Sequence, residues 1–166
     1  MPVPPPSLKG RVLRLLSTRE YSRIELERKL RRHETEPGEL AGVLDGLQAK
    51  GFIDDKRVIE SVIHRRAAKL GAGRICQELH DKGLPADAIR AAVAGLQASE
   101  LQRAGAVWRK KFAATLPGGG DEPDPARATA ERARQIRFLA ARGFGGDTIR
   151  RVVSGAGDCT DGEESA

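Results

Sequence analysis

Apolar side chains recur along most of this chain at three- and four-residue steps, the spacing that places them on one face of an α-helix. The alternation of apolar and polar positions that is typical of a strand is scarce. The first four stripes are Val12, Leu13 and Leu16; Ile24, Leu26 and Leu30; Leu40, Val43, Leu44 and Leu47; and Val58, Ile59, Val62 and Ile63. The pattern predicts an all-α protein.

Residues that start and end helices separate these stripes. Ser22 and Glu25 have the S-x-x-E spacing of a capping box, which predicts a helix beginning there. Gly51 is expected to end a helix, and Asp54 and Asp55 are expected to cap the next one. The sequence therefore predicts short helices joined by tight turns.

One pattern of apolar residues and a glycine recurs along the chain. Steps of 4, 6 and 4 residues separate Leu79, Gly83, Ile89 and Val93. The same steps separate Leu139, Gly143, Ile149 and Val153. They also separate Leu30, Glu34, Leu40 and Leu44, where glutamate takes the place of the glycine. A helix that ends sharply needs a left-handed residue after its last turn, and glycine adopts that conformation most readily. A chance match of common residues is the alternative, and the matched glycines weigh against it.

Upstream of this pattern, Leu26 and Ile75 occupy the same offset in the first two copies. Gln135 breaks the pattern in the third copy, and Ile136 is the candidate replacement. Each copy therefore predicts a helix, a tight turn and a second helix, with another helix before them.

A repeat of this length predicts three tandem three-helix repeats stacked into an elongated, curved array. The predicted segments are a disordered Pro-rich lead at 1–7, repeat 1 at 8–53, repeat 2 at 54–97, repeat 3 at 98–154 with a flexible insertion at 116–125, and an acidic disordered tail at 155–166.

Charge is distributed unevenly along the 166 residues. The last twelve hold four acidic residues and no Lys or Arg, so the rest carries 29 basic and 23 − 4 = 19 acidic residues, a net charge of +10. A basic body favours an anionic partner such as nucleic acid or an acidic protein face. Solubility alone is the alternative explanation.

The sequence offers no constellation typical of catalysis or metal binding. His33, His64 and His80 are scattered, and although Cys76 lies four residues before His80, two ligands do not make a metal site. A buried structural Cys76 is the better interpretation. Gly118–Gly120 lacks the Lys-Ser/Thr ending of a phosphate-binding loop. We therefore predict a protein that is not an enzyme and has no cofactor.

Two cysteines are too few to staple a chain of this length, which favours the reducing cytoplasm. The N-terminus has no apolar stretch resembling a signal peptide, and no run approaches the ~18 apolar residues of a membrane span. A cytoplasmic protein without a membrane partner is expected.

Basic clusters are the candidate binding residues, because Lys and Arg side chains can reach phosphates or carboxylates. They are Arg28, Lys29, Arg31 and Arg32; Arg65, Arg66 and Lys69; Arg74; Arg109, Lys110 and Lys111; and Arg150 and Arg151. The alternative is a solvated helix face with partners four residues away, such as Glu25 with Lys29.

Other residues have structural interpretations. Arg57 is expected to pair locally with Asp54 and Asp55. Trp108 and Phe112 could stack on bases, but their helical spacing favours a place in the core. Tyr21 precedes the capping box and is expected to be its hydrophobic staple.

The stretch 51–84 resembles the central part of the RecX family. The matching motifs are "GxIDDxR" at Gly51–Arg57, the pair Arg65–Arg66, the approach Gly71–Gly73, and "RIxxELxxKG" at Arg74–Gly83. The segments 13–30 and 137–153 also resemble the first and last repeats of that family. The chain departs from the family pattern at Val58 and Val62, where aromatic residues are usual, and at Lys69, where glycine is common.

The resemblance implies a curved stack of three-helix repeats that binds the RecA recombinase filament on single-stranded DNA. Members of the family lie along the filament groove, interfere with its extension, and damp strand exchange, ATP hydrolysis and LexA co-cleavage. A monomeric regulator that inhibits RecA, and so modulates DNA repair and the SOS response, is the leading expectation. A stand-alone DNA-binding protein with helix-turn-helix-like units is the alternative, against which Asn, a common base-reading residue, is absent. A scaffold without nucleic acid is a weaker third possibility.

Overall fold

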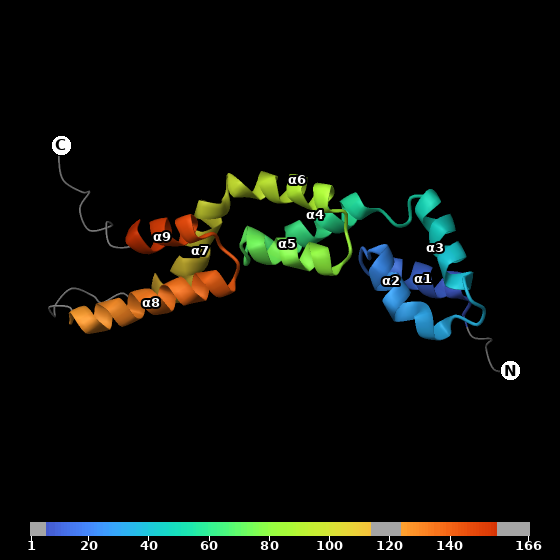
Figure 1. The fold of residues 1–166 in the computed structure, drawn as a ribbon, viewed down its shortest axis with the longest axis horizontal. Coiled ribbons are helices and arrows are strands. Elements are labelled where there is room, and N and C mark those ends of the chain that lie inside the picture. The colour runs from blue at the N-terminus through green and yellow to red at the C-terminus, as the bar shows by residue number, and fades with distance from the viewer. Residues whose placement is uncertain (1–5, 114–123, 156–166) are drawn as a thin grey trace. The chain divides into compact units, whose positions relative to one another are not determined.

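The computed structural model describes residues 6–113 and 124–155, and within these ranges it contains helices and no strands (Figure 1). In chain order the elements are α1 (Leu8–Leu16), α2 (Arg23–Leu30), the 3-10 helix η1 (Arg31–His33), α3 (Glu39–Ala49), α4 (Asp55–Arg66), α5 (Ala72–Asp81), α6 (Ala86–Gln97), α7 (Glu100–Phe112), α8 (Pro125–Ala141) and α9 (Gly146–Gly155). The predicted all-α fold is confirmed.

The chain divides into two compact units. The first comprises residues 1–63 and 78–89, and the second comprises residues 64–77 and 90–166. Helices α1, α2 and α3 belong to the first unit and α7, α8 and α9 to the second, whereas α4, α5 and α6 contribute residues to both. The elongated, curved shape expected for the whole array stays a prediction.

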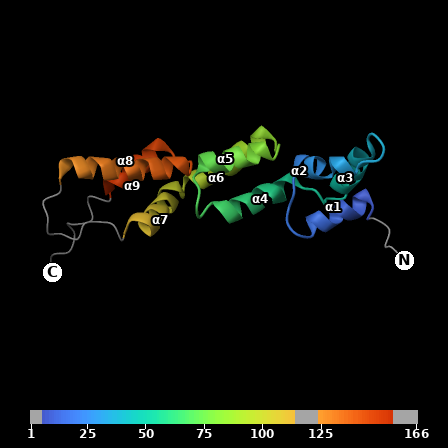
Figure 2. The same ribbon diagram turned by 90° about the horizontal axis from the view of Figure 1, so that it is seen from below.

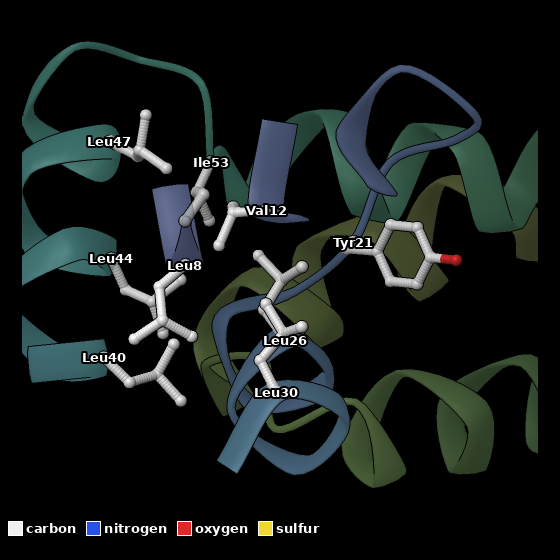
Figure 3. Close-up of a cluster of buried hydrophobic side chains, with 9 residues drawn as sticks. All are labelled: Leu8, Val12, Tyr21, Leu26, Leu30, Leu40, Leu44, Leu47 and Ile53. Atoms are coloured by element: carbon white, nitrogen blue, oxygen red, sulfur yellow. The ribbon is translucent and has the colours of Figure 1, made fainter. Parts of the chain in front are cut away.

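The core of the first unit lies between α1, α2 and α3. Figure 3 shows Leu40, Leu44 and Leu47 in a row along α3, beside Leu8 of α1 and with Leu26 and Leu30 of α2 across from them. These side chains are at most 6% exposed. Burying one leucine of this kind stabilises the fold by about 1.5–3 kcal/mol, so the helical stripes that predict the elements also hold them together.

The start of α2 is fixed by a complete capping box. The Ser22 hydroxyl accepts a hydrogen bond from the Glu25 N–H, and the Glu25 carboxylate accepts one from the Ser22 N–H at 3.0 Å. Tyr21 is buried in the same cluster as Leu26, the position that a staple residue packs against. The predicted capping box is confirmed, and the burial of Tyr21 agrees with its predicted staple role.

The core of the second unit lies between α7, α8 and α9, whose last two members run side by side (Figure 2). Trp108 and Phe112 are 5% and 1% exposed, which confirms that both are core residues. The Phe112 ring meets the Phe138 ring edge-on, with 5.1 Å between ring centroids. This aromatic packing supplies the large apolar groups that are otherwise rare in the chain.

The prediction that Ile136 substitutes for Gln135 is wrong. Gln135 is buried, at 8% exposed, and Ile136 is 39% exposed. The Gln135 side-chain oxygen accepts a hydrogen bond from the Trp108 indole N–H at 3.0 Å. A buried indole N–H needs an acceptor, and this need outweighs the apolar pattern of the other two repeats.

The predicted glycine turns are confirmed. Gly51, Gly83 and Gly143 have φ angles of 73°, 70° and 79°. In each case the residue after the glycine donates its N–H to the carbonyl five residues back, as Leu84 does to Leu79 and Phe144 does to Leu139. This is the Schellman motif, and the buried Leu84 and Phe144 fold back onto the ends of their helices.

Each glycine turn of the repeat pattern contacts the start of an earlier helix. In the first unit, the Ser22 hydroxyl donates to the Lys82 carbonyl at 2.7 Å, and a Cβ on Gly83 would overlap the Ile24 side chain. In the second unit, the Gly71 N–H, just before α5, donates to the Arg142 carbonyl at 2.9 Å. Both units therefore contain the same turn-to-helix contact.

The second unit makes this contact more tightly. The Gly73 N–H donates to the Gly143 carbonyl at 3.0 Å, and a Cβ on Gly71 would overlap the Gly143 carbonyl oxygen. Two backbones approach each other at this point without an intervening side chain. Gly71 does not have a positive φ, so its role is to permit close approach rather than an unusual conformation.

Repeat 1 has Glu34 where the other repeats have glycine, and the turn differs accordingly. α2 continues into η1, and the Glu34 carboxylate accepts hydrogen bonds from the N–H groups of Gly38 and Leu40 at the start of α3. Glu34 thus satisfies unpaired donors at a helix start, a task that glycine cannot perform.

Parts of the predicted irregular segments are ordered. Ser7 caps α1 by accepting from the Gly10 N–H, Asp124 caps α8, Pro125 is the first residue of α8, and Gly155 is the last residue of α9. Asp124, Pro125 and Gly155 therefore belong to helices or their caps, although the sequence predicts them in the flexible insertion and the disordered tail. Residues 1–5, 114–123 and 156–166 lie outside the described residues.

We predict that Gly71→Ala lowers the free energy of unfolding by about 1–3 kcal/mol, because the added methyl group must displace backbone rather than a flexible side chain. The measurement is urea unfolding followed by circular dichroism. Gly95→Ala in α6 is the matched control, since its Cβ meets nothing within 4 Å and helix propensity should favour alanine by up to about 1 kcal/mol. Equal stability of the two variants would contradict the close approach.

Candidate functional site

The first predicted basic cluster lies over two separate hollows of the first unit. Lys29 and Arg32 line a groove between α1 and the end of α2, whereas Arg28 and Arg31 line another hollow with Ile24 and Glu27. The groove, called here the basic groove, is lined by Pro6, Arg11, Arg14, Leu15, Thr18, Lys29, Leu30, Arg32 and His33.

Cations stand on both walls of the basic groove. Arg11 and Arg14 lie three residues apart on α1, and Lys29 of α2 and Arg32 of η1 are also three residues apart. This spacing puts both members of each pair on one helical face. Between the walls lies Leu30, which is buried, and its neighbour Leu15, which is half-buried. The groove therefore combines an aliphatic floor with a cationic rim.

No acidic residue lines the basic groove among the residues that the structure describes. Arg11 donates to the Pro6 carbonyl and Arg32 donates to His33, but neither has a carboxylate partner there. Desolvation and the charges of Arg11 and Arg32 lower the pKa of His33. The groove is thus a region of positive potential that a bound anion would relieve.

Arg23 at the start of α2, which does not line the basic groove, shows the contrast. Arg23 pairs with Glu27 at 2.9 Å and with Asp45 of α3 at 2.5 Å. Exposed pairs of this kind contribute about 0–1 kcal/mol each and leave no net positive charge. Arg23 is therefore neutralised, whereas no acidic residue of the described chain lines the groove.

Sequence reasoning found Lys29 and Arg32 but missed Arg11, Arg14 and His33. A signal was present, because Arg11 and Arg14 have the same i,i+3 spacing as the pair on the facing wall. Only the packing of α1 against α2 brings the two pairs together, and no local pattern in the sequence reports that packing.

The other candidate residues lie on separate helices. Arg65 and Arg66 are in the last turn of α4, Lys69 follows that helix, and Arg74 is exposed on α5 beside the Gly143 turn. Arg109, Lys110 and Lys111 are exposed in the last turn of α7, where the helix dipole favours cations. Arg150 pairs with Asp147 on α9, and Arg151 is exposed.

The pairing of Glu25 with Lys29, the example given for the alternative of a solvated helix face, is not observed. Glu25 instead contacts Lys82 at 2.7 Å and Arg19 at 3.0 Å. Lys29 is thereby left to the basic groove, with its ammonium 5.9 Å from the centre of the Tyr21 ring. Because Glu25 also belongs to the capping box, its carboxylate already accepts hydrogen bonds from three donors.

The expected local pairing of Arg57 is wrong. Its guanidinium contacts Glu20 at 3.1 Å and donates to the Phe52 carbonyl. Asp54 instead caps α4 by accepting from the N–H groups of Lys56 and Arg57. The Asp54 carboxylate caps the helix instead of pairing with the Arg57 guanidinium, because the unpaired N–H groups of the first turn are fixed at hydrogen-bonding distance from it.

Glu25 and Lys82 are the charged part of the turn-to-helix contact in the first unit. Burial alone would raise the pKa of Glu25, but hydrogen bonds from Lys82, from the Ser22 backbone and from Arg19 lower it to about 2. The Lys82 side chain is 11% exposed. These two side chains therefore stabilise the contact and are already paired with each other, so they are not candidates for binding a ligand.

Arg103 has the corresponding role in the second unit. Its guanidinium donates to the carbonyls of Ala67 and Leu70 at 2.9 and 2.8 Å, and burial lowers its pKa. Glu100, on the same helix, accepts from the Ala72 N–H and from the Thr148 hydroxyl. Sequence reasoning missed both residues, since their partners are 28 to 48 positions away.

Within residues 6–113 and 124–155, no three His, Cys, Asp or Glu side chains are grouped so that they could hold a metal ion. No helix in the same ranges is long and apolar enough to cross a membrane.

The helices and the basic groove define a class of protein: an all-helical chain of three-helix domains with an unneutralised cationic surface on the first. Three family models match it, described as the first, second and third three-helix domains of RecX, over residues 9–47, 54–93 and 98–153. The chain belongs to the RecX family, as its motifs predict.

Curated relatives match over nearly their whole length. "Regulatory protein RecX" of Leptothrix cholodnii is 48% identical over 147 residues, which cover 89% of this chain and 87% of the relative. The protein of the same name from Ralstonia nicotianae is 42% identical over 156 residues, covering 94% and 92%. These relatives are named as regulatory proteins rather than after a catalysed reaction.

Two solved structures share the fold. A crystal structure of RecX from Lactobacillus salivarius has a TM-score of 0.68 at 19% identity and covers 89% of this chain and 93% of its own. A crystal structure described as regulatory protein RecX has a TM-score of 0.70 at 22% identity, covering 89% and 71%. The three-domain helical fold is therefore confirmed.

We predict that Glu25→Gln lowers the free energy of unfolding by about 1–3 kcal/mol at pH 7, because Lys82 loses its partner. The folded pKa of about 2 lies below the ordinary value of 4.5, so the carboxylate stabilises the fold above pH 4.5 and this contribution is lost as the pH falls towards 2. Urea unfolding at several pH values measures it.

Glu60→Gln, on the exposed face of α4, is the control and should change stability by less than about 0.5 kcal/mol. A gap between wild type and Glu25→Gln that stays constant from pH 7 to pH 2 would rule out the ionic contribution.

Proposed function

We propose that this protein binds the RecA filament on single-stranded DNA and inhibits its recombinase, ATPase and co-protease activities, and so modulates DNA repair and the SOS response. The observation that carries the proposal is 48% identity to a regulatory RecX protein across 87% of that relative's length. All three RecX domain models match the chain, which supports the same kind of role.

The basic residues support an anionic partner of this kind. A nucleoprotein filament presents phosphates and acidic protein surface together, and Arg and Lys on a helical scaffold can reach both. Lys29 and Arg32 of the basic groove are the strongest contact candidates, because no carboxylate of the described chain neutralises them. Arg28, Arg31, Arg65, Arg66, Lys69, Arg74, Arg109, Lys110, Lys111, Arg150 and Arg151 are the further candidates, on DNA directly or through RecA.

Inhibition by such a protein needs binding and no catalysis. A protein that contacts neighbouring filament subunits opposes their addition and the motions that accompany ATP hydrolysis, and it does so by its binding energy alone. We propose that it acts as a monomer in the cytoplasm, where DNA and its recombinase are found.

A stand-alone DNA-binding protein is the second candidate, favoured by the same unneutralised cations. The two candidates differ in their dependence on the partner. A pure single-strand binder that neutralises about six phosphates would lose affinity with a log–log salt slope near −4. Tighter binding to RecA-coated DNA than to naked DNA supports the proposal, and equal binding to both supports the second candidate.

We expect substoichiometric amounts of the wild-type protein to suppress ATP hydrolysis by RecA on single-stranded DNA. Lys29→Glu with Arg32→Glu should raise the concentration needed for half inhibition about tenfold, because both contacts become repulsive. The measurement is a coupled ATPase assay with the protein titrated in.

Lys50→Glu with Lys56→Glu changes the net charge equally at exposed positions outside the groove and should inhibit as the wild type does. A wild-type protein that leaves the hydrolysis rate unchanged at excess concentration would refute the proposed function.

A further inference from the structure

The basic groove brings two features together in one hollow. Four cationic side chains stand on its two walls, and two leucines form its floor. A helix face that only contacts water does not require the leucines, and a patch that only packs against the core does not require the cations. The ligand that satisfies both carries negative charges on either side of an apolar group.

The cations of the groove lie near enough to act on one another. Desolvation and the charges of Arg11 and Arg32 lower the pKa of His33, which also lines the groove. Elsewhere on the same domain, Arg23 and Arg19 are each paired with a carboxylate. Repulsion that the fold leaves uncompensated at one place is typical of a binding site, where the ligand supplies the opposite charge.

The floor distinguishes between two classes of anion. Sites for single-stranded nucleic acid stack bases on aromatic rings. The side chains that line the basic groove include Leu15 and Leu30, and its one aromatic ring among the described residues is the imidazole of His33. Tyr21, whose phenol oxygen points away from the leucine cluster in Figure 3, does not line it. An aliphatic floor suits an aliphatic or aromatic side chain of a protein.

We propose that the basic groove binds an acidic protein segment that carries a large apolar side chain between its carboxylates. The apolar side chain contacts Leu15 and Leu30. Carboxylates on one side meet Arg11 and Arg14 of α1, and those on the other side meet Lys29 and Arg32. Arginine can bind a carboxylate through two parallel hydrogen bonds, which suits recognition at the rim.

This inference rests on the proposed function, because the acidic segment would belong to the filament that the protein binds. It adds which kind of segment the first domain would recognise. The groove itself is a property of the chain alone. Its test therefore contains no recombinase, so failure of the groove to bind and failure to inhibit ATP hydrolysis are separate results.

The probe is the peptide acetyl-EEELEEE-amide, titrated into the full-length protein at low ionic strength. The methyl resonances of Leu15 and Leu30 report occupation of the floor. We expect these resonances to shift in a saturable manner. A peptide with serine in place of the central leucine should bind about tenfold more weakly, because it buries no apolar group.

Arg11→Glu with Arg14→Glu should weaken binding of the leucine peptide at least about tenfold. Lys9→Glu with Lys50→Glu is the matched control, since Lys9 is exposed on the same helix but does not line the groove, and it should bind within about twofold of the wild type. An equal loss of affinity for the leucine peptide in both variants would show that only the net charge matters, and it would overturn the proposal.

A heptathymidine oligonucleotide is the competing ligand. Stronger shifts of Leu15 and Leu30 with the oligonucleotide than with the leucine peptide would overturn the proposal in favour of nucleic acid. Equal affinity for the leucine and serine peptides would overturn the role of the floor, and no shift with any probe would overturn the site.

Discussion

The contact on which this fold depends joins the start of one helix to the glycine turn of the next repeat. In the second unit the Gly71 N–H donates to the Arg142 carbonyl, and in the first unit the Ser22 hydroxyl donates to the Lys82 carbonyl. In both contacts a donor at a helix start, a backbone N–H in one and a hydroxyl in the other, meets the carbonyl just before a left-handed glycine. This arrangement satisfies polar groups where two repeats meet, so thin three-helix cores can be joined in tandem.

How far the sequence predicts this contact depends on which parts of it are local. Gly83 and Gly143 are predicted correctly as turns, because the left-handed conformation depends on the identity of one residue, which the sequence gives directly. The role of Gly71 is not predicted, since only the position of Gly143 explains why a side chain is excluded there. Gln135 is buried against expectation for the same reason: its partner, Trp108, lies on another helix.

The site divides in the same way between what is local and what is not. Lys29 and Arg32 stand out in the sequence as part of a basic run, whereas Arg11 and Arg14 become part of the site only because α1 packs against α2. The sequence does not predict the partner of Glu25, because i,i+4 spacing identifies partners only within one helix and Lys82 is 57 residues away. The family relationship was recognisable from short motifs, since Lys82-Gly83 and Gly71-x-Gly73 are the residues that join the repeats.

The turn-to-helix contact is tested most directly by native-state hydrogen exchange of the Gly71 and Gly73 amides. Amide hydrogens at a helix start ordinarily exchange fast, because they have no partner within the helix. We expect these two amides to be protected to nearly the same extent as the buried middle of α5, since they donate to Arg142 and Gly143. Exchange as fast as at the exposed start of α1 would contradict it.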